Sequence, residues 1–220
     1  MPSTFYLRLS IPNLCILRNV DRVLYMDSDT LALKDLTSLY QTDLEGKMLG
    51  IAPHALRIVH GYMLRTTLGY GDKSRFFNTG VMLMDLNKLR EVQFEETCMR
   101  RLSIESNYLD TETLIAHTFF DDIKPLPPTA NLLYPLIEKN YPHMRDIFYW
   151  NLMYHTRYKS ITELLEDTYI LHFFEESNNP IPPIKKIYNE SEKRLVDFLN
   201  TEIINTNVEK SDYEIIHKYI

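Results

Sequence analysis

Residues 22–33, RVLYMDSDTLAL, decide the fold of this chain. The uncharged run 23–26 is rich in β-branched and aromatic side chains and has polar neighbours, a pattern typical of a buried strand. Asp27 and Asp29 follow at its exit, and side chains two residues apart on an extended segment point the same way. Two carboxylates that face one space are hard oxygen ligands for Mg²⁺ or Mn²⁺. The stretch therefore predicts a buried strand that ends in a divalent-metal site.

The residues after the acidic pair narrow this interpretation. A pair at this spacing arises by chance about once per chain at this aspartate content. However, YMDSDTLALKDLTSLY, residues 25–40, resembles the Asp-x-Asp region of family 8 glycosyltransferases. A competing pattern is the haloacid-dehalogenase phosphatase signature, which needs Thr or Val at the fifth position and uses the first Asp as nucleophile. Leu31 occupies that position and Thr30 comes one place early, so the phosphatase is the weaker alternative.

A second stretch strengthens the resemblance. Residues 76–86, FFNTGVMLMDL, are similar to the family's Asn-x-Gly turn and the buried strand after it. The resemblance makes Asn78, Thr79 and Gly80 substrate-binding residues. The amide of Asn78 can bond a sugar hydroxyl, and Gly80 permits a close backbone approach at a turn. An ordinary turn before a strand is the alternative.

Two further substrate-binding candidates follow from the same resemblance. Arg8 lies in an apolar stretch, residues 4–17, that resembles the helix before the Asp-x-Asp strand, where an arginine lies near the sugar nucleotide. A surface arginine on an amphipathic helix is the alternative. Asn131, in the proline-rich stretch 123–135, matches an asparagine of the family pattern.

The catalytic candidate is Asp110, in YLDTETLIAH, residues 108–117. It matches an aspartate that lies beside the reacting sugar in the family, although an N-cap for a helix from Thr111 is the alternative. The segment departs from the family pattern, because Thr111, Glu112 and Ile115 replace Gln, Asp and Asn.

His172, in YILHFF, residues 169–174, matches the third metal ligand of the family. If it has that role, an imidazole nitrogen should lie within about 5 Å of the carboxylates of Asp27 and Asp29. A structural histidine in the core is the alternative. After His172 the sequence departs from the family pattern, since no lysine precedes Pro180 to neutralise a diphosphate.

The other elements are predicted from pattern alone. Residues 48–53 read as a core strand. A helix is expected over 88–101, with Asn87 as N-cap and with core candidates Leu89, Val92, Phe94 and Met99. Ser160 and Glu163 form a capping box that opens a short helix. The tail 184–220 is helical in pattern and is expected to be an appendage to a domain over residues 1–183.

Composition excludes several classes of protein. With 220 residues, 45% of them hydrophobic, the chain can bury a substantial core. The net charge is −6 with interspersed signs, so nucleic acid is not expected as a partner. Two cysteines indicate reduced thiols rather than a disulfide framework. We expect no membrane span and no signal peptide, and a cytoplasmic location, with the periphery of the inner membrane as a further option.

The alternation of short buried strands with helices predicts an α/β fold. The resemblance implies that this fold is of GT-A type, with a mixed central sheet flanked by helices and without the first βα units of the family. The resemblance implies transfer of a hexose, with retention, from UDP-glucose or UDP-galactose to a saccharide or glycolipid acceptor such as a lipopolysaccharide core. The implied cofactor is Mn²⁺ or Mg²⁺. The alternative is an inactive sugar- or metal-binding remnant, which the missing units, Thr111 and the absent lysine favour.

Overall fold

The computed structural model describes residues 3–53, 77–105, 111–133, 151, 156–173, 190 and 193. The chain divides into two compact units, Met1–Glu176 and Ser177–Ile220, and every element named below lies in the first. The expected appendage 184–220 falls outside the described residues except at 190 and 193. Within the described ranges, no helix combines the length and the apolar character that crossing a membrane requires.

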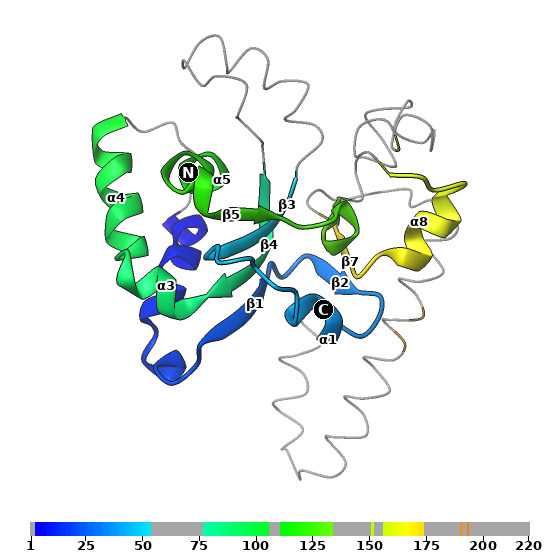
Figure 1. The fold of residues 1–220 in the computed structure, drawn as a ribbon, viewed down its shortest axis with the longest axis horizontal. Helices are drawn as coiled ribbons and strands as arrows, with labels where there is room; N and C mark the ends of the chain where they lie inside the picture. Colours follow the sequence, from blue (N-terminus) through cyan, green and yellow to red (C-terminus); the bar gives the residue numbers. More distant parts are fainter. Residues whose placement is uncertain are drawn as a thin grey trace, which may run out of the picture. The chain divides into compact units, whose positions relative to one another are not determined.

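A four-stranded mixed sheet forms the centre of the first unit (Figure 1). Its order is β1-β4-β3-β5. The first three strands pair antiparallel and β5 runs parallel to β3, as the predicted fold class requires. The strands are β1 (Arg22–Met26), β4 (Phe77–Asp85), β3 (Leu49–Pro53) and β5 (Ile123–Pro125).

The strand before the acidic pair is less buried than its sequence predicts. β1 pairs with β4 on one side, and no strand of the described ranges pairs with its other side. All of its side chains are half-buried. The predicted second strand, β3, is buried up to Pro53. Both strands are confirmed to within one residue, but β1 is an edge strand of the described sheet.

The structure corrects the Asn-x-Gly turn that the sequence predicted, because these residues form part of a strand. Asn78, Thr79 and Gly80 belong to β4, which is fully buried from Phe77 to Met84. The reason is pairing at the end of the sheet, where the Asp27 amide donates to the Gly80 carbonyl at 2.7 Å. These residues therefore lie in the sheet rather than before it.

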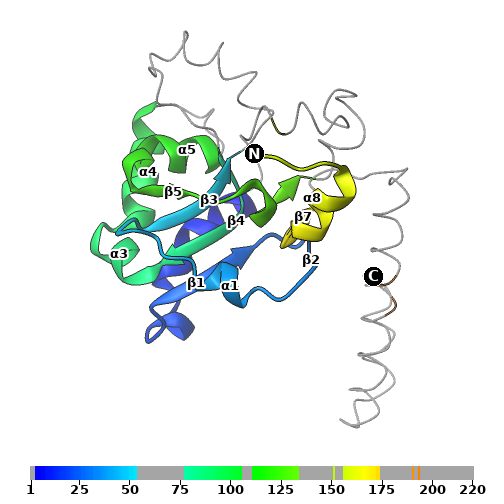
Figure 2. The same ribbon diagram turned by 45° about the vertical axis from the view of Figure 1, so that its right-hand side comes forward.

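A second sheet of three strands lies beside the first (Figure 2). Its order is β2-β7-β6, with β2 antiparallel and β6 parallel to β7. The bounds are β2 (Thr30–Ala32), β7 (Ile170–His172) and β6 (Leu132–Leu133). β2 begins three residues after Asp27, so the acidic pair lies where the chain passes from one sheet to the other.

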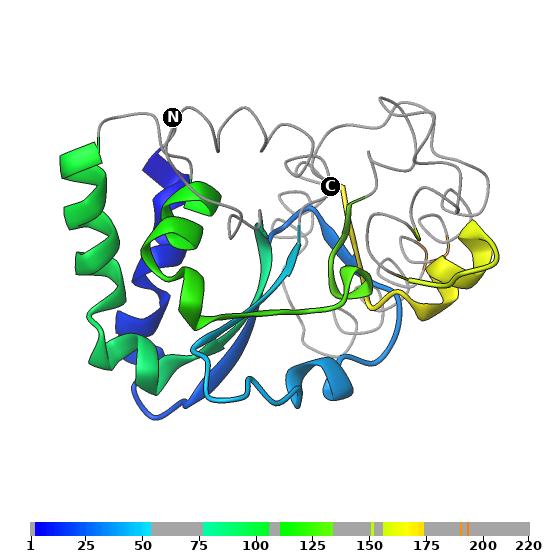
Figure 3. The same cartoon turned by 45° about the horizontal axis from the view of Figure 1, so that its top comes forward.

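Helices cover one face of the four-stranded sheet (Figure 3). Alternation along β4 divides the core, because Met82 and Met84 face these helices while Val81 and Leu83 pack on the opposite face with Leu39 of α1. The covering helices are the 3₁₀ helix η1 (Ser3–Asn13), α3 (Leu86–Glu91), α4 (Phe94–Glu105) and α5 (Thr111–Thr118). The shorter elements are η2 (Cys15–Leu17), α1 (Thr37–Tyr40), η3 (Phe120–Asp122) and η4 (Pro128–Ala130).

The helix predicted over 88–101 is two helices. α3 is N-capped by Asp85, whose side chain accepts from the Lys88 amide, and not by Asn87. The chain leaves the helix before α4, where Gln93 has a φ of 49°. Val92 is 39% exposed and Met99 is 45% exposed, so neither is the core residue that the sequence predicted. Leu89 and Phe94 are buried as predicted.

The N-cap predicted at Ser160, at the start of α8 (Ile161–Asp167), is confirmed, whereas the Glu163 side chain bonds the amide of the residue before the cap. The Ser160 hydroxyl accepts from the Glu163 amide at 3.1 Å, and a Glu163 carboxylate oxygen accepts from the Lys159 amide at 2.6 Å. α8 leads directly into β7 and thereby delivers His172 to the second sheet.

Candidate metal centre

The acidic pair and His172 meet at the junction of the two sheets. Asp27 follows β1, Asp29 precedes β2, and β7 pairs with β2 so that His172 lies opposite Thr30. The His172 Nε2 is 3.3 Å from Asp29 Oδ1. One ligand atom from each of the three residues lies within 4.8 Å of the others. The expected closeness of His172 to the carboxylates is therefore confirmed, while its role as a ligand stays a prediction.

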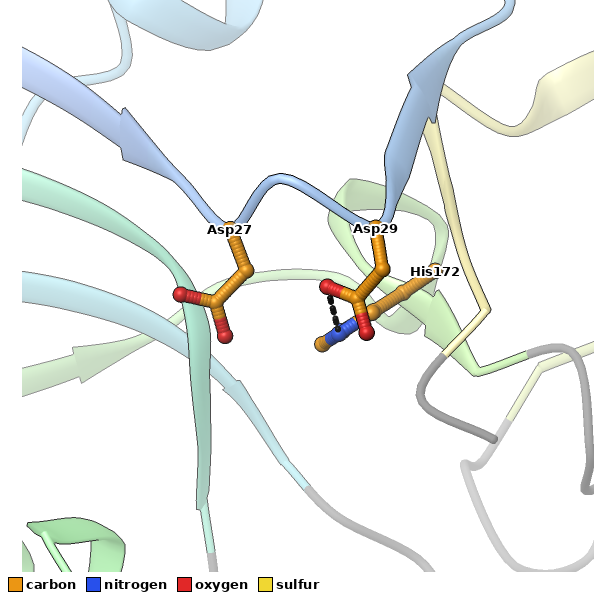
Figure 4. A group of neighbouring side chains, drawn as sticks. All are labelled: Asp27, Asp29 and His172. Carbon is orange, nitrogen blue, oxygen red and sulfur yellow. Dashed lines mark ion pairs between the residues drawn. The ribbon is translucent and has the colours of Figure 1, made fainter. Parts of the chain in front are cut away.

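The three side chains of the site differ in exposure. Asp27 and Asp29 project to the same side of the turn, and the imidazole reaches toward Asp29 (Figure 4). The side chain of His172 is 3% exposed, whereas those of Asp27 and Asp29 are 22% and 45% exposed. One buried nitrogen and two partly exposed carboxylates suit a divalent cation whose other positions are taken by water or phosphate oxygens.

The charge state of the imidazole suits the same role. Burial lowers the pKa of His172 from its ordinary value, and the carboxylates of Asp29 and Asp27 oppose that shift. The net direction favours the neutral ring, which is the form that binds metal ions.

Arg8 lies directly against the acidic pair. Its guanidinium is 3.1 Å from Asp27 Oδ1 and also donates to the carbonyl and the hydroxyl oxygen of Thr79, at 3.0 and 2.9 Å. It stacks over the Tyr25 ring, 5.3 Å from its centroid. Arg8 and Thr79, both predicted to bind substrate, are thus joined to the predicted metal ligand Asp27.

Tyr25 is a site residue that the sequence interpretation missed. Its hydroxyl donates to Asp27 Oδ1. Burial first, and then this hydrogen bond, raise the pKa of Tyr25 to about 12. The phenol is therefore a permanent donor at neutral pH. Alternation along a strand could have found it, since Tyr25 and Asp27 are two residues apart and point the same way.

A buried polar network lies behind the imidazole. His172 Nδ1 is 3.1 Å from Asn131 Oδ1, and Asn131 Nδ2 donates to Asn78 Oδ1 at 2.8 Å. Asn78 Nδ2 donates to Glu112 Oε1 at 2.8 Å. Asn78 and Asn131, both predicted to bind substrate, are thus 5% and 4% exposed and bonded to each other. Glu112 was also missed, although it lies in the motif that contains the catalytic candidate.

Gly80 makes room for the imidazole. A Cβ at this position would come within 2.2 Å of His172 Cε1 and 2.8 Å of Nδ1. The expected close approach at Gly80 is therefore present, but the neighbour is a side chain and the glycine lies within a strand. Asp110 is outside the described residues, immediately before the first residue of α5.

Comparison with known proteins identifies relatives of this chain. A family model described as "Glycosyl transferase family 8" matches residues 1–179. Probable galacturonosyltransferase-like 4 of Arabidopsis thaliana is 28% identical over 95 residues, which make up 40% of this chain and 27% of that protein. Glycosyltransferase GlyF of Streptococcus pneumoniae is 33% identical over 116 residues, or 51% of this chain and 26% of GlyF. The chain thus spans about a quarter of the length of these relatives.

Solved structures share the fold. The apo structure of the bifunctional glycosyltransferase WbbM matches with a TM-score of 0.64 and 17% identity, over 86% of this chain and 37% of that one. The galactosyltransferase LgtC, solved with donor and acceptor sugar analogues, matches with a TM-score of 0.58 and 21% identity, over 80% of this chain and 59% of that one. These matches show a GT-A type fold, and the family match favours a glycosyltransferase over the phosphatase alternative. Because the family model covers most of its length, the chain belongs to glycosyltransferase family 8.

Proposed function

We propose that this chain carries the metal and donor site of a glycosyltransferase that moves a hexose from UDP-glucose or UDP-galactose to a saccharide or glycolipid acceptor. The observation that carries the proposal is that His172 meets Asp27 and Asp29, from which it is separated by most of the sequence. Asp27 is already paired with Arg8 and Tyr25, so what favours a metal ion is the set of ligands, since two carboxylates and an imidazole nitrogen are groups that Mn²⁺ binds.

Each residue of the site has a proposed role. Asp27, Asp29 and His172 would hold Mn²⁺ or Mg²⁺, which when bound acts as a Lewis acid toward the diphosphate leaving group. Arg8 brings a fixed positive charge beside Asp27 and is the proposed contact to the donor. The half-exposed Asp29 leaves the site accessible to solvent.

The sugar transfer itself is assigned to residues near the start of α5. Asp110 is the proposed catalytic residue, and the reaction proceeds with retention, as the family resemblance implies. In support, Glu112 accepts a hydrogen bond from Asn78, so the first turn of α5 reaches the network behind His172. A lipopolysaccharide-type acceptor and a cytoplasmic location at the inner membrane rest on the family resemblance alone.

Titration calorimetry with Mn²⁺ and then UDP tests the metal role. We expect Asp27→Asn and Asp29→Asn each to weaken Mn²⁺ binding at least tenfold without changing the circular dichroism spectrum. Asp121→Asn is the matched control, since this exposed acid lies on η3 and should leave the affinity unchanged. Equal Mn²⁺ affinity in all three variants and the wild type would refute the proposal.

A release assay separates an active enzyme from a remnant. The chain is incubated with Mn²⁺ and either UDP-glucose or UDP-galactose, and free UDP is measured. Release that depends on Asp29 supports hexose transfer to water or acceptor. Tight Mn²⁺ and UDP binding without any release supports the inactive remnant.

A further inference from the structure

The two nitrogens of His172 face different partners. Nδ1 lies 3.1 Å from Asn131 Oδ1, and Nε2 lies 3.3 Å from Asp29 Oδ1. A neutral imidazole carries one N–H, and the nitrogen that holds it is set by the partner of that nitrogen. The position of this proton decides whether the acidic pair meets an N–H group or a lone pair.

The orientation of the amides follows from one backbone group. The Gly80 N–H can only donate, and it lies 2.9 Å from the side-chain atom Oδ1 of Asn78. That atom must therefore be an oxygen. The Asn131 amide atom 2.8 Å from the same oxygen must be a donor, so it is the NH₂ group. The other amide atom of Asn131, which faces His172, is then the oxygen.

Asn78 is fixed at its other end as well. Its NH₂ group donates to Glu112 Oε1 at 2.8 Å, and an ionised carboxylate only accepts. A flipped Asn78 would place its oxygen against this carboxylate and its NH₂ against the Gly80 N–H. Both contacts would be repulsive, and neither amide is exposed enough to exchange them for water.

We propose that Asn131 and Asn78 are positioning residues that hold His172 in its Nδ1–H tautomer, so that Nε2 presents a lone pair toward Asp29. The inference rests on the proposed function, which supplies a cation for that lone pair. It gives both amides a role other than the substrate binding that the sequence predicts for them. Glu112 and the Gly80 amide both bond Asn78 and fix its orientation, and we call the hydrogen-bonded series Glu112, Asn78, Asn131 and His172 the relay.

The consequence of losing the relay is specific. Without an acceptor at Nδ1, the ring gains more by placing its proton on Nε2, where the Asp29 carboxylate lies 3.3 Å away. The new N–H···O bond would occupy both the nitrogen and the carboxylate that the cation needs. The relay therefore prevents a hydrogen bond that would close the site.

Nitrogen NMR on the metal-free chain measures the tautomer directly. Two-bond ¹H–¹⁵N correlation spectra are recorded on ¹⁵N-histidine-labelled protein above the ordinary histidine pKa of about 6.5. Signals missing from His172→Gln identify the residue. We expect Nδ1–H in the wild type, and Nε2–H in Asn131→Leu.

Asn151→Ala is the matched control. Asn151 also uses both amide atoms, bonding Tyr158 and Thr156, and its loss should leave the His172 tautomer unchanged. A wild-type ring with Nε2–H, or with both nitrogens protonated, would overturn the proposal. So would an Asn131→Leu ring that keeps Nδ1–H. The wild-type spectrum is decisive even if Asn131→Leu does not fold.

Mn²⁺ affinity links the tautomer to the site. Groups that orient a ligating histidine change metal affinity by about 10- to 100-fold, and we expect a loss of that size in Asn131→Leu. The two proposals fail separately. Nδ1–H in a wild-type chain that does not bind Mn²⁺ would refute only the proposed function, whereas Mn²⁺ binding with Nε2–H in the metal-free chain would refute only the positioning role.

Discussion

Gly80 and His172 are in contact across the two sheets, with no space for a methyl group between them. A Cβ on Gly80 would lie 2.2 Å from the imidazole Cε1. The ring cannot move aside cheaply, because it is buried and its nitrogens face Asn131 and Asp29. The glycine is required here for space and not for an unusual backbone conformation.

Gly80→Ala should therefore damage stability and metal binding together. Overpacking a buried position costs about 1–3 kcal/mol, and displacement of His172 should weaken Mn²⁺ binding at least tenfold. Thermal unfolding and calorimetry measure the two effects. Gly50→Ala is the matched control, because its Cβ would meet only side-chain atoms of Leu44 and Leu126, at 2.9 and 3.1 Å. It should lower stability and spare Mn²⁺ binding, and equal Mn²⁺ loss in both variants would contradict this account.

Arg8→Gln should have opposite effects on the two ligands. Removing the guanidinium from Asp27 takes away a competing positive charge, so Mn²⁺ alone should bind more tightly by ~1 kcal/mol. UDP in the presence of Mn²⁺ should bind more weakly, since Arg8 is the proposed donor contact. Competition titrations at fixed ionic strength measure both.

The control for this charge change is Arg90→Gln. Arg90 lies on α3 and donates to the carbonyls of Pro12 and Leu17, at 2.8 and 2.7 Å. Its loss should leave both affinities unchanged. Weaker Mn²⁺ binding in Arg8→Gln would show that the guanidinium supports the acidic pair and does not compete with the cation.

The two cysteines should react very differently. Cys15 is exposed and Cys98 is buried, and burial raises the pKa of the Cys98 thiol to about 12. Iodoacetamide at about pH 8 should label Cys15 alone, since only the thiolate reacts. Raising the pH to about 9 should not bring Cys98 into reaction while the chain is folded. Mass spectrometry of digested protein measures this, and prompt labelling of Cys98 would show that α4 opens readily.

Two substitutions on α4 test its corrected packing. Phe94 is 1% exposed and stacks on Phe119, with ring centroids 5.2 Å apart, so Phe94→Ala should cost about 3–5 kcal/mol. Met99→Ala should cost less than about 0.5 kcal/mol, because the residue is 45% exposed. Urea unfolding measures both losses of stability. Similar losses would show that Met99 packs in the core, as the single helix expected from the sequence requires.

Local patterns predicted those parts of the fold that depend on neighbouring residues. The apolar run before Asp27 gave a strand, and Ser160 with Glu163 gave a helix start, because both depend on side chains within a few positions. The break at Gln93 could not be found this way. Its positive φ is uncommon for a residue with a Cβ, and packing of two separate helices outweighs the continuous helical pattern.

The candidate site shows the same division. Asp27 and Asp29 were found by spacing, and His172 by its resemblance to a family motif. The hydrogen bonds of Asn78 and Asn131 were not predictable, because an amide can bond a sugar as well as a side chain. Only the fold brings them to one another and to Glu112.

The short link between the sheets has a consequence for local unfolding. The chain passes from β1 to β2 through the acidic pair, and the Phe173 amide donates to the Asp29 carbonyl at 2.8 Å. A cation held between Asp27, Asp29 and His172 would bind only while β2 and β7 are joined to the main sheet. The amides of the small sheet should then exchange with deuterium more slowly as Mn²⁺ is added, in proportion to its occupancy. The metal ion proposed for catalysis would thus also determine how often the small sheet separates from the main sheet and exposes its amides to water.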